Sequence, residues 1–229
     1  MKRPAIQAAL IMALVSCSQP LAPVWANPSS ASSPGLMTRI RQFLGVQPRT
    51  VSVGGTRSSA GSVVCLLAPG PIQQVNGVNQ VLIVQAQPDL VLGTPLNELE
   101  IRSGNLVLHS QLATSKTPIE GRLAWPLPPL QPGERLLLAM RPQGAAGGDW
   151  AVVQLEAASA AEQQRYATEL QASASDARQR LLQLDQAAAA GDGALAQALV
   201  WAPLTPSSSA LAALQREQQA NCKTISSAR

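Results

Sequence analysis

The chain contains few aromatic and few charged side chains. Aromatic residues make up 3% and charged residues 13% of its 229 residues, whereas charged residues make up about a quarter of an average soluble domain. The core must therefore be built from leucine, valine, isoleucine and alanine, and few groups remain for acid–base chemistry. The net charge of +4 is small, and Lys2 and Arg3 contribute two of the positive charges from a segment that we expect to be removed. This balance argues against a nucleic-acid partner.

The sequence also lacks a catalytic constellation. Its one histidine, His109, falls in an expected surface strand, and no Gly-x-Ser-x-Gly motif is present. Glu98 and Glu100 lie two residues apart on one strand, where such a pair far more often faces solvent than forms a glycosidase centre. The chain has too few cysteines and histidines for an ordinary zinc site, and neither a dinucleotide fingerprint nor a P-loop occurs. We therefore expect a non-catalytic protein without metal or cofactor.

The amino terminus has the layout of an export signal. Met1-Lys2-Arg3 precedes an apolar run from Ala5 to Val15, and Val24-Trp25-Ala26 supplies a cleavage site, so residues 1–26 are predicted to be a signal peptide. The apolar run is too short for a permanent membrane span. The residues that end in Cys17 also fit a lipoprotein box, in which Cys17 would carry lipid. Both routes predict an exported protein of the periplasm or cell envelope, either free or as a membrane-anchored lipoprotein.

Export raises the question of a disulfide, because exported proteins meet an oxidising compartment. Cys65 lies in an apolar strand and Cys222 lies near the carboxyl terminus. The two either pair with each other or remain as one buried and one exposed thiol. No spacing rule decides between these alternatives for a single distant pair.

Residues 61–157 are predicted to be a β-rich domain. Short apolar or alternating runs recur at regular spacing with turn signals between them. The segment from Leu130 to Leu136 contains Pro132-Gly133 and predicts a tight corner that leads into a buried strand ending near Arg141. About seven strands are expected, which is the number in an immunoglobulin constant-type sandwich.

The corner at residues 130–136 resembles the one before the sixth strand of fibronectin type III and other immunoglobulin-like sandwiches. Those domains often carry a tyrosine at the position of Leu136, which here contributes packing and no hydroxyl hydrogen bond. The resemblance implies an amino-terminal all-β immunoglobulin-like sandwich. With the helical tail described below, the fold class of the whole chain is expected to be α+β.

A second resemblance is carried by Gly54-Gly55-Thr56-Arg57, followed by Cys65 on a strand and by Leu66-Leu67-Ala68-Pro69. This arrangement resembles an uncharacterised family of exported, mainly cyanobacterial proteins with a signal peptide and a β-rich domain. The resemblance covers residues 50–156, although residues 81–92 lack the aromatic residues of the family's strands. The family has no assigned activity, so the resemblance implies export and a β-rich domain and carries over no catalytic residue.

Residues 27–60 are expected to be a linker with one short amphipathic segment at 36–44. Arg39 and Arg41 accompany the apolar residues of this segment. It is expected to cap the domain, and the alternative is contact with an anionic membrane surface. Membrane contact is expected only through this segment or through a lipidated Cys17.

Residues 158–229 are predicted to be helical. Ser159 and Glu162 form a capping box, which starts a long amphipathic helix that bends near residues 173–175 and ends at Gly191. A second, shorter helix is expected to start at Ala194, and a last helix is expected to run toward Cys222. The apolar stripe of the tail predicts a partner surface made of Tyr166, Leu170, Leu181 and Leu184.

The expected function is a non-catalytic protein-binding or structural module of the cell envelope, with an envelope protein as its partner. The alternative is a carbohydrate-binding module that uses Trp125 and Trp150 as a stacking platform. In a chain with so few aromatic residues, packing in the core is the commoner use of tryptophan. A hydrolase centred on His109 is the least favoured interpretation.

Overall fold

The computed structural model describes residues 35–46, 50–52, 63–145, 147–205 and 207–227. All of them belong to one unit, Pro34–Arg229. The predicted signal peptide, Cys17 and the Gly54–Arg57 motif lie outside the described residues, as does most of the expected linker.

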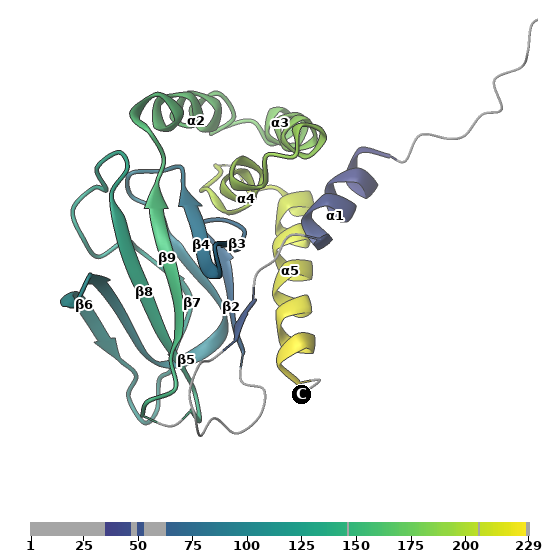
Figure 1. Ribbon diagram of the computed structural model, residues 1–229. Helices are drawn as coiled ribbons and strands as arrows, with labels where there is room; N and C mark the ends of the chain where they lie inside the picture. The colour runs from purple at the N-terminus through teal and green to yellow at the C-terminus, as the bar shows by residue number, and fades with distance from the viewer. Residues whose placement is uncertain (1–34, 47–49, 53–62, 146, 206, 228–229) are drawn as a thin grey trace, which may run out of the picture. The chain divides into compact units, whose positions relative to one another are not determined.

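The described chain is α+β, as predicted, with nine strands in one curled mixed sheet and five helices. The strands are β1 (Thr50–Ser52), β2 (Val63–Ala68), β3 (Gln73–Val75), β4 (Val78–Ile83), β5 (Leu90–Ser103), β6 (Leu106–Leu112), β7 (Ile119–Leu123), β8 (Arg135–Pro142) and β9 (Ala151–Ala157). The helices are α1 (Leu36–Val46), α2 (Ala160–Ala172), α3 (Ala177–Ala190), α4 (Gly193–Trp201) and α5 (Ser209–Ser227). Figure 1 shows α5 running alongside β2, with α2, α3 and α4 gathered at one end of the strands.

Strand β5 holds the sheet together. Its first half pairs with β2 and β7, its second half pairs with β6 and β8, and the order continues from β8 through β9 and β4 to β3. All pairings are antiparallel except that of β4 with β9. In the sequence, a short apolar run at residues 90–92 and a separate alternating run at residues 98–102 predict two strands here. The structure instead continues one strand through them with shifts of register on both sides of Leu96.

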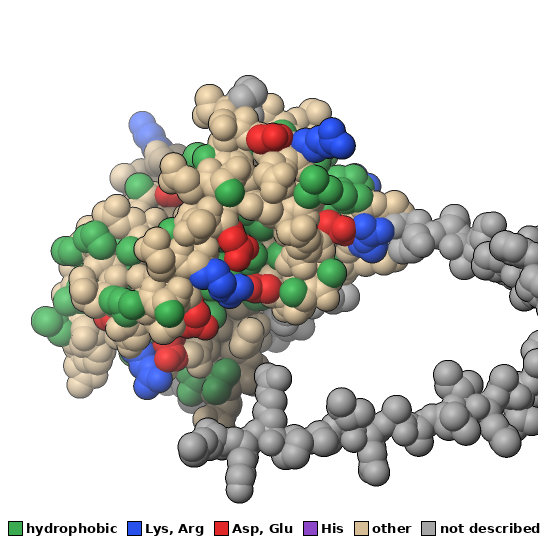
Figure 2. All heavy atoms as spheres, turned by 90° about the horizontal axis from the view of Figure 1, so that it is seen from above, with side chains coloured by type: hydrophobic (Ala, Val, Ile, Leu, Met, Phe, Trp, Pro, Cys, Tyr) green, Lys and Arg blue, Asp and Glu red, His purple; other side chains and the backbone are tan. Residues whose placement is uncertain are grey.

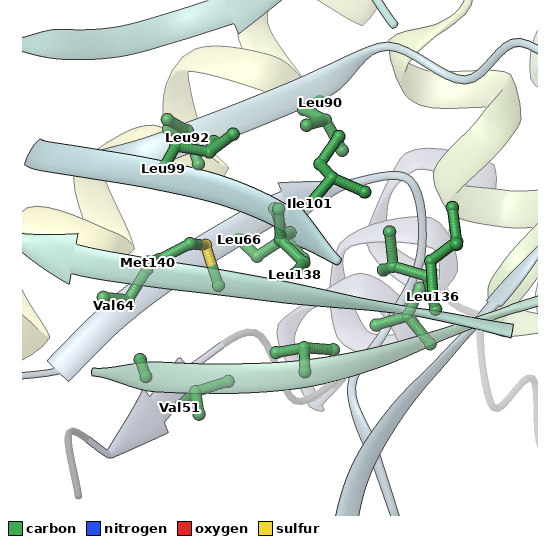
Figure 3. Packing of buried hydrophobic residues seen from close by; sticks show 14 of the residues in the cluster. Val51, Val64, Leu66, Leu90, Leu92, Leu99, Ile101, Leu136, Leu138 and Met140 are labelled. Atoms are coloured by element: carbon green, nitrogen blue, oxygen red, sulfur yellow. The ribbon is translucent and has the colours of Figure 1, made fainter. Parts of the chain in front are cut away.

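Inward-facing side chains from both halves of the curled sheet form the first hydrophobic cluster. Val64 and Leu66 of β2 meet residues of β5, β8 and β9 there (Figure 3). Every second residue of β9 contributes, since Ala151, Val153 and Leu155 point inward and are almost completely buried. This period of two is the pattern of a strand with one buried face.

The predicted corner before β8 is confirmed. Glu134 donates its backbone N–H to the carbonyl of Gln131 at 3.0 Å, and Gly133 has a φ of +74°. Proline at the second and glycine at the third position, with positive φ at the glycine, are typical of a type II turn. Leu136 then enters the first cluster with 3% of its surface exposed.

A two-residue hairpin between β3 and β4 was not predicted. Asn76 and Gly77 both have positive φ, 51° and 79°, and Val75 pairs with Val78. This is the backbone of a type I′ turn, for which Asn-Gly is the strongest sequence signal. The residues around the turn include Gln73, Gln74, Asn79 and Gln80, and the two valines next to it are exposed, so no buried apolar alternation marks β3.

The helices form a second hydrophobic cluster on the other face of β2. Cys65, Leu67 and Ala68 point into this cluster, where residues of all five helices surround them. The apolar side of α1 also packs there, with Ile40 and Leu44 buried. The basic residues of α1 form ion pairs with the other helices, Arg39 with Asp185 at 2.6 Å and Arg41 with Glu217 at 3.0 Å.

The helical caps follow the local sequence. The predicted capping box at Ser159 and Glu162 is confirmed, and each of the two side chains accepts a backbone N–H at the start of α2. The single long helix that we expected is two helices, because Asp176 accepts the N–H groups of Arg178 and Gln179 and starts α3 anew. The break between α2 and α3 includes residues 173–175, where the bend is predicted.

A disulfide joins Cys65 of β2 to Cys222 of α5, with the two Cα atoms 5.8 Å apart. Gly93 of β5 lies directly beneath this bond. A Cβ atom at Gly93 would lie 2.7 Å from the Cys222 Sγ and 3.3 Å from the Cys65 Cβ. Only glycine leaves room for the disulfide at this point of the sheet.

We predict that Gly93→Ala destabilises the protein by about 1–3 kcal/mol, because the added methyl group forces α5 away from the sheet. The measurement is the free energy of unfolding from urea titration. Gly148→Ala is the matched control, since a Cβ there meets open space. An equal loss of stability in the two variants would contradict the close approach at Gly93.

A second prediction concerns Tyr166, the single tyrosine of the chain. Its buried phenol donates a hydrogen bond to Asp192 at 2.9 Å, and burial together with this bond raises the pKa of Tyr166 to about 12. Because the folded state favours the neutral phenol, this contribution to stability is present below pH ~10 and is lost as the pH rises toward 12.

Absorbance titration of the folded protein at high pH reports Tyr166 alone. We expect its midpoint near pH 12 in the native chain, and a lower midpoint in Asp192→Asn, where the carboxylate is neutralised and the cap of α4 is kept. A midpoint at the ordinary value near 10 in the native chain would refute the buried environment.

Candidate functional site

The carboxylates considered for catalysis are engaged in structural ion pairs. Glu98 accepts hydrogen bonds from Arg141, and Glu100 pairs with Arg102 on the same strand. His109 lies half-buried on the edge strand β6, opposite Ile101 of β5. In the described part of the chain, no three metal-ligating side chains gather at one place.

Trp125 and Trp150 do not form a platform together. Trp125 is 9% exposed in the first hydrophobic cluster and donates its Nε1–H to the carbonyl of Pro128 at 3.1 Å. Trp150 is half-buried on the outer face of the sheet, where the guanidinium groups of Arg102 and Arg141 lie 5.5 and 5.7 Å from its ring centre. The Trp125 ring is therefore part of the core, and two guanidinium groups lie against the Trp150 ring.

The expected partner surface of the tail is covered within the chain itself. Tyr166, Leu170 and Leu184 are buried in the second hydrophobic cluster, and Leu181 packs against it half-buried. The stripe seals the helices against β2 and its neighbours, which corrects the expectation that it faces a partner. The segment at 36–44 likewise turns its apolar residues inward as part of α1. No helix among the described residues has the length and apolar character of a membrane span.

Charged side chains on the helical end mostly neutralise one another. Figure 2 looks onto this end and shows most of the basic side chains next to acidic ones. Arg165, for example, lies 3.4 Å from Asp192 and 3.8 Å from Glu169. A buried arginine differs from this pattern.

This arginine, Arg180 of α3, lines a pocket of about 540 Å³ between the sheet and the helices. The walls are the loop at residues 84–87, one side of α2, Pro132 of the corner before β8, and the segment after α4. Leu130 donates its N–H to the carbonyl of Ala86 at 2.8 Å, which joins the corner to the loop. The same corner that introduces β8 thus helps to shape the pocket.

Arg180 is 1% exposed and ties three segments together. Its Nη1 donates to the carbonyls of Ala202 and Pro203 at 2.8 and 3.1 Å, and its Nε donates to the Ser173 Oγ at 3.4 Å. The carbonyls follow α4, at the negative end of its dipole, where a cation is favourable. Burial nevertheless lowers the pKa of Arg180, and no carboxylate of the described residues pairs with it.

Amide side chains surround the pocket, and none of its lining residues is acidic. The amide side chains are those of Gln85, Gln87, Gln163, Gln164 and Gln171. The Nε2 of Gln163 is buried and has no hydrogen-bond partner in the part of the chain that the structure describes. The remaining walls are mostly alanine, proline, valine and leucine.

A different surface lies at the edge strand β6. It pairs only with β5 within the described residues, so its other edge is open. Leu106 and Leu112 are each 65% exposed, and no residue from 106 to 112 is charged. Leu108 has no partner on β5, because the register shifts between Ile101 and Arg102 and leaves a bulge.

Sequence reasoning did not find the pocket. Arg180 lies within an amphipathic helix, where an arginine ordinarily faces solvent, and glutamines are common on exposed helical surfaces. The signal that could have indicated a polar pocket was the number of glutamines in α2. The prediction of an amphipathic helix already accounted for these glutamines as residues of its solvent-exposed side. Comparison with known proteins adds no assignment: no family model, no curated protein and no solved structure matches the chain.

Proposed function

We propose that the chain is a non-catalytic, exported module of the cell envelope that binds a protein partner by strand addition at β6. The observation that carries this proposal is the open, uncharged edge of β6 with its two highly exposed leucines. Sheet edges of monomeric proteins are normally protected by charges, by proline or by a covering segment. An edge with exposed leucines and no charge is the kind of surface that binds an extended peptide segment.

The chemistry of β6 indicates the occupant. Its exposed residues between 106 and 112 are leucine, valine, serine and glutamine, so a matching strand is extended, uncharged and largely apolar. The bulge at Leu108 interrupts the regular edge and leaves His109–Leu112 as its regular part. A short segment of another protein fits this length better than the whole β6 of a second copy, which would have to match the bulge.

Export and an oxidising compartment are supported by two observations. The amino-terminal sequence has the layout of a signal peptide, and Cys65 and Cys222 are joined by a disulfide. The finer description of the β-rich part as an immunoglobulin-like sandwich belongs to this proposal too. It is supported by the corner before β8 and by the inward-facing residues of both halves of the curled sheet.

We predict that a lysine on the open edge of β6 weakens binding of the partner. A photo-crosslinking amino acid placed at Leu106 should capture a partner in intact cells, and the additional change Leu112→Lys should reduce the yield at least about tenfold, because it places an unpaired charge against an apolar strand. Leu182→Lys on α3 is the control, since Leu182 is also an exposed apolar residue and lies away from β6.

Mass spectrometry of the captured peptide decides the occupant. An uncharged, largely apolar segment of another exported protein supports the proposal. Capture of a second copy of this chain, or a yield that Leu112→Lys and Leu182→Lys change equally, contradicts it.

The export proposal predicts the intact mass of the secreted protein. Cleavage after Ala26 leaves a chain that starts at Asn27, whereas lipidation leaves a chain that starts at Cys17 and carries acyl groups. In either case we expect the mass to be lower than that of the reduced chain by the two hydrogens lost from Cys65 and Cys222. A mass that includes Met1–Ala26 would rule out processing.

A further inference from the structure

We propose that the pocket at Arg180 binds a small molecule through a carboxylate group, with Arg180 as the counter-ion and Gln163 as a second hydrogen-bond donor. This ligand site is separate from the strand edge at β6. The proposal rests on the geometry of the buried guanidinium and on the chemistry of the surrounding walls.

Two arginines from other elements donate hydrogen bonds to carbonyl groups at the end of α4, and their other partners can be compared. Arg122 of β7 donates through Nη2 to the carbonyl of Trp201 at 2.7 Å and through Nη1 to the Asp89 carboxylate at 2.6 Å. Arg180 binds the next carbonyls of the same segment, but it has no acidic partner in the described residues. The pocket lies beside Arg180, the one of the two that pairs with no carboxylate in the described part of the chain.

An unpaired cation at this depth is unfavourable. Removing a guanidinium from water is strongly unfavourable, and carbonyl groups offset that cost only in part. The guanidinium has five N–H donors. The hydrogen bonds of Arg180 to Ser173, Ala202 and Pro203 use Nε and Nη1, and Nη2 makes no hydrogen bond to the described residues. A carboxylate in the pocket would supply both the missing charge and the missing acceptor.

Gln163 adds a second donor at the same pocket. Its Nε2 is buried and makes no hydrogen bond to the described chain. The unpartnered Nε2 of Gln163, the guanidinium of Arg180 and the absence of acidic lining residues favour a ligand rich in acceptor oxygens. One cation with no lysine or second arginine in the walls fits a monocarboxylate better than a phosphate dianion.

The walls also limit the rest of the ligand. Ala167 and Leu170 of α2, together with Pro203, offer apolar surface for a short hydrocarbon part. The volume of about 540 Å³ is in the ordinary range for small-molecule sites. Both a free organic acid and the terminal carboxylate of a peptide have this chemistry.

Calorimetric titration of the full-length protein with hexanoate tests the site, with hexanamide as the neutral probe of the same shape. We expect hexanoate to bind and hexanamide to bind at least about tenfold more weakly, because only the acid supplies a charge to Arg180. N-acetyl-alanyl-leucine and its carboxamide form the second pair of probes. Tighter binding of the dipeptide acid than of hexanoate identifies a peptide terminus as the source, and the reverse order identifies a free acid.

Variants of the lining residues test whether the acids bind in this pocket. Arg180→Gln should weaken binding of the acids about tenfold or more, while Arg178→Gln, on an exposed part of the same helix, should leave it unchanged. Gln163→Ala and Ala167→Trp change residues of α2 that are only partly buried or exposed, so they test the pocket even if Arg180→Gln does not fold. Gln186→Ala is their exposed control.

Loss of acid binding in Gln163→Ala or Ala167→Trp, with no loss in Gln186→Ala, supports the site. The proposal is overturned if neither acid binds the native protein at millimolar concentration, if acids and amides bind equally, or if none of the pocket variants weakens binding.

Discussion

Burial of strand β2 on both faces is the constraint on which the rest of the structure depends. All six of its residues are buried, with Val64 and Leu66 in the sheet's own cluster and Cys65 and Leu67 in the helical cluster. A strand of a mainly antiparallel sheet commonly has one solvated face. Here the helices supply the second cover, so the sheet and the helices cannot be separated without exposing a row of apolar side chains to water.

The helical cover is fixed to β2 by directional contacts as well as by apolar packing. Gln197 of α4 donates to the carbonyl of Leu67 at 2.6 Å, and Trp201 donates to Gln218 of α5 at 3.0 Å. Both glutamines are buried, and a buried amide is tolerated only where it finds partners. These bonds set the angle and depth of the helices, and the disulfide above Gly93 holds α5 to β2 and β5. The pocket at Arg180 follows from this placement, because its walls come from both layers.

The two proposed binding surfaces, the edge of β6 and the pocket at Arg180, are accessible for different structural reasons. Among the described residues, the helices do not cover β6, so its leucines are exposed and one of its edges is unpaired. The pocket lies where sheet loops and helix ends meet without filling the space between them. The pocket offers hydrogen-bond donors, apolar area and one cation, whereas the edge of β6 offers backbone hydrogen bonds and apolar side chains.

The sequence by itself determined the elements whose causes are local. Pro132-Gly133 produces its turn, and Ser159 and Glu162 cap α2, since each depends on neighbours within a few residues. Only the tertiary structure decided that β5 is one strand, that the apolar stripe of the tail covers β2, and that no carboxylate among the described residues pairs with Arg180. Those outcomes depend on residues more than twenty positions apart. A local sequence pattern does not show which distant side chains pack around a given residue, or whether a pocket remains beside it.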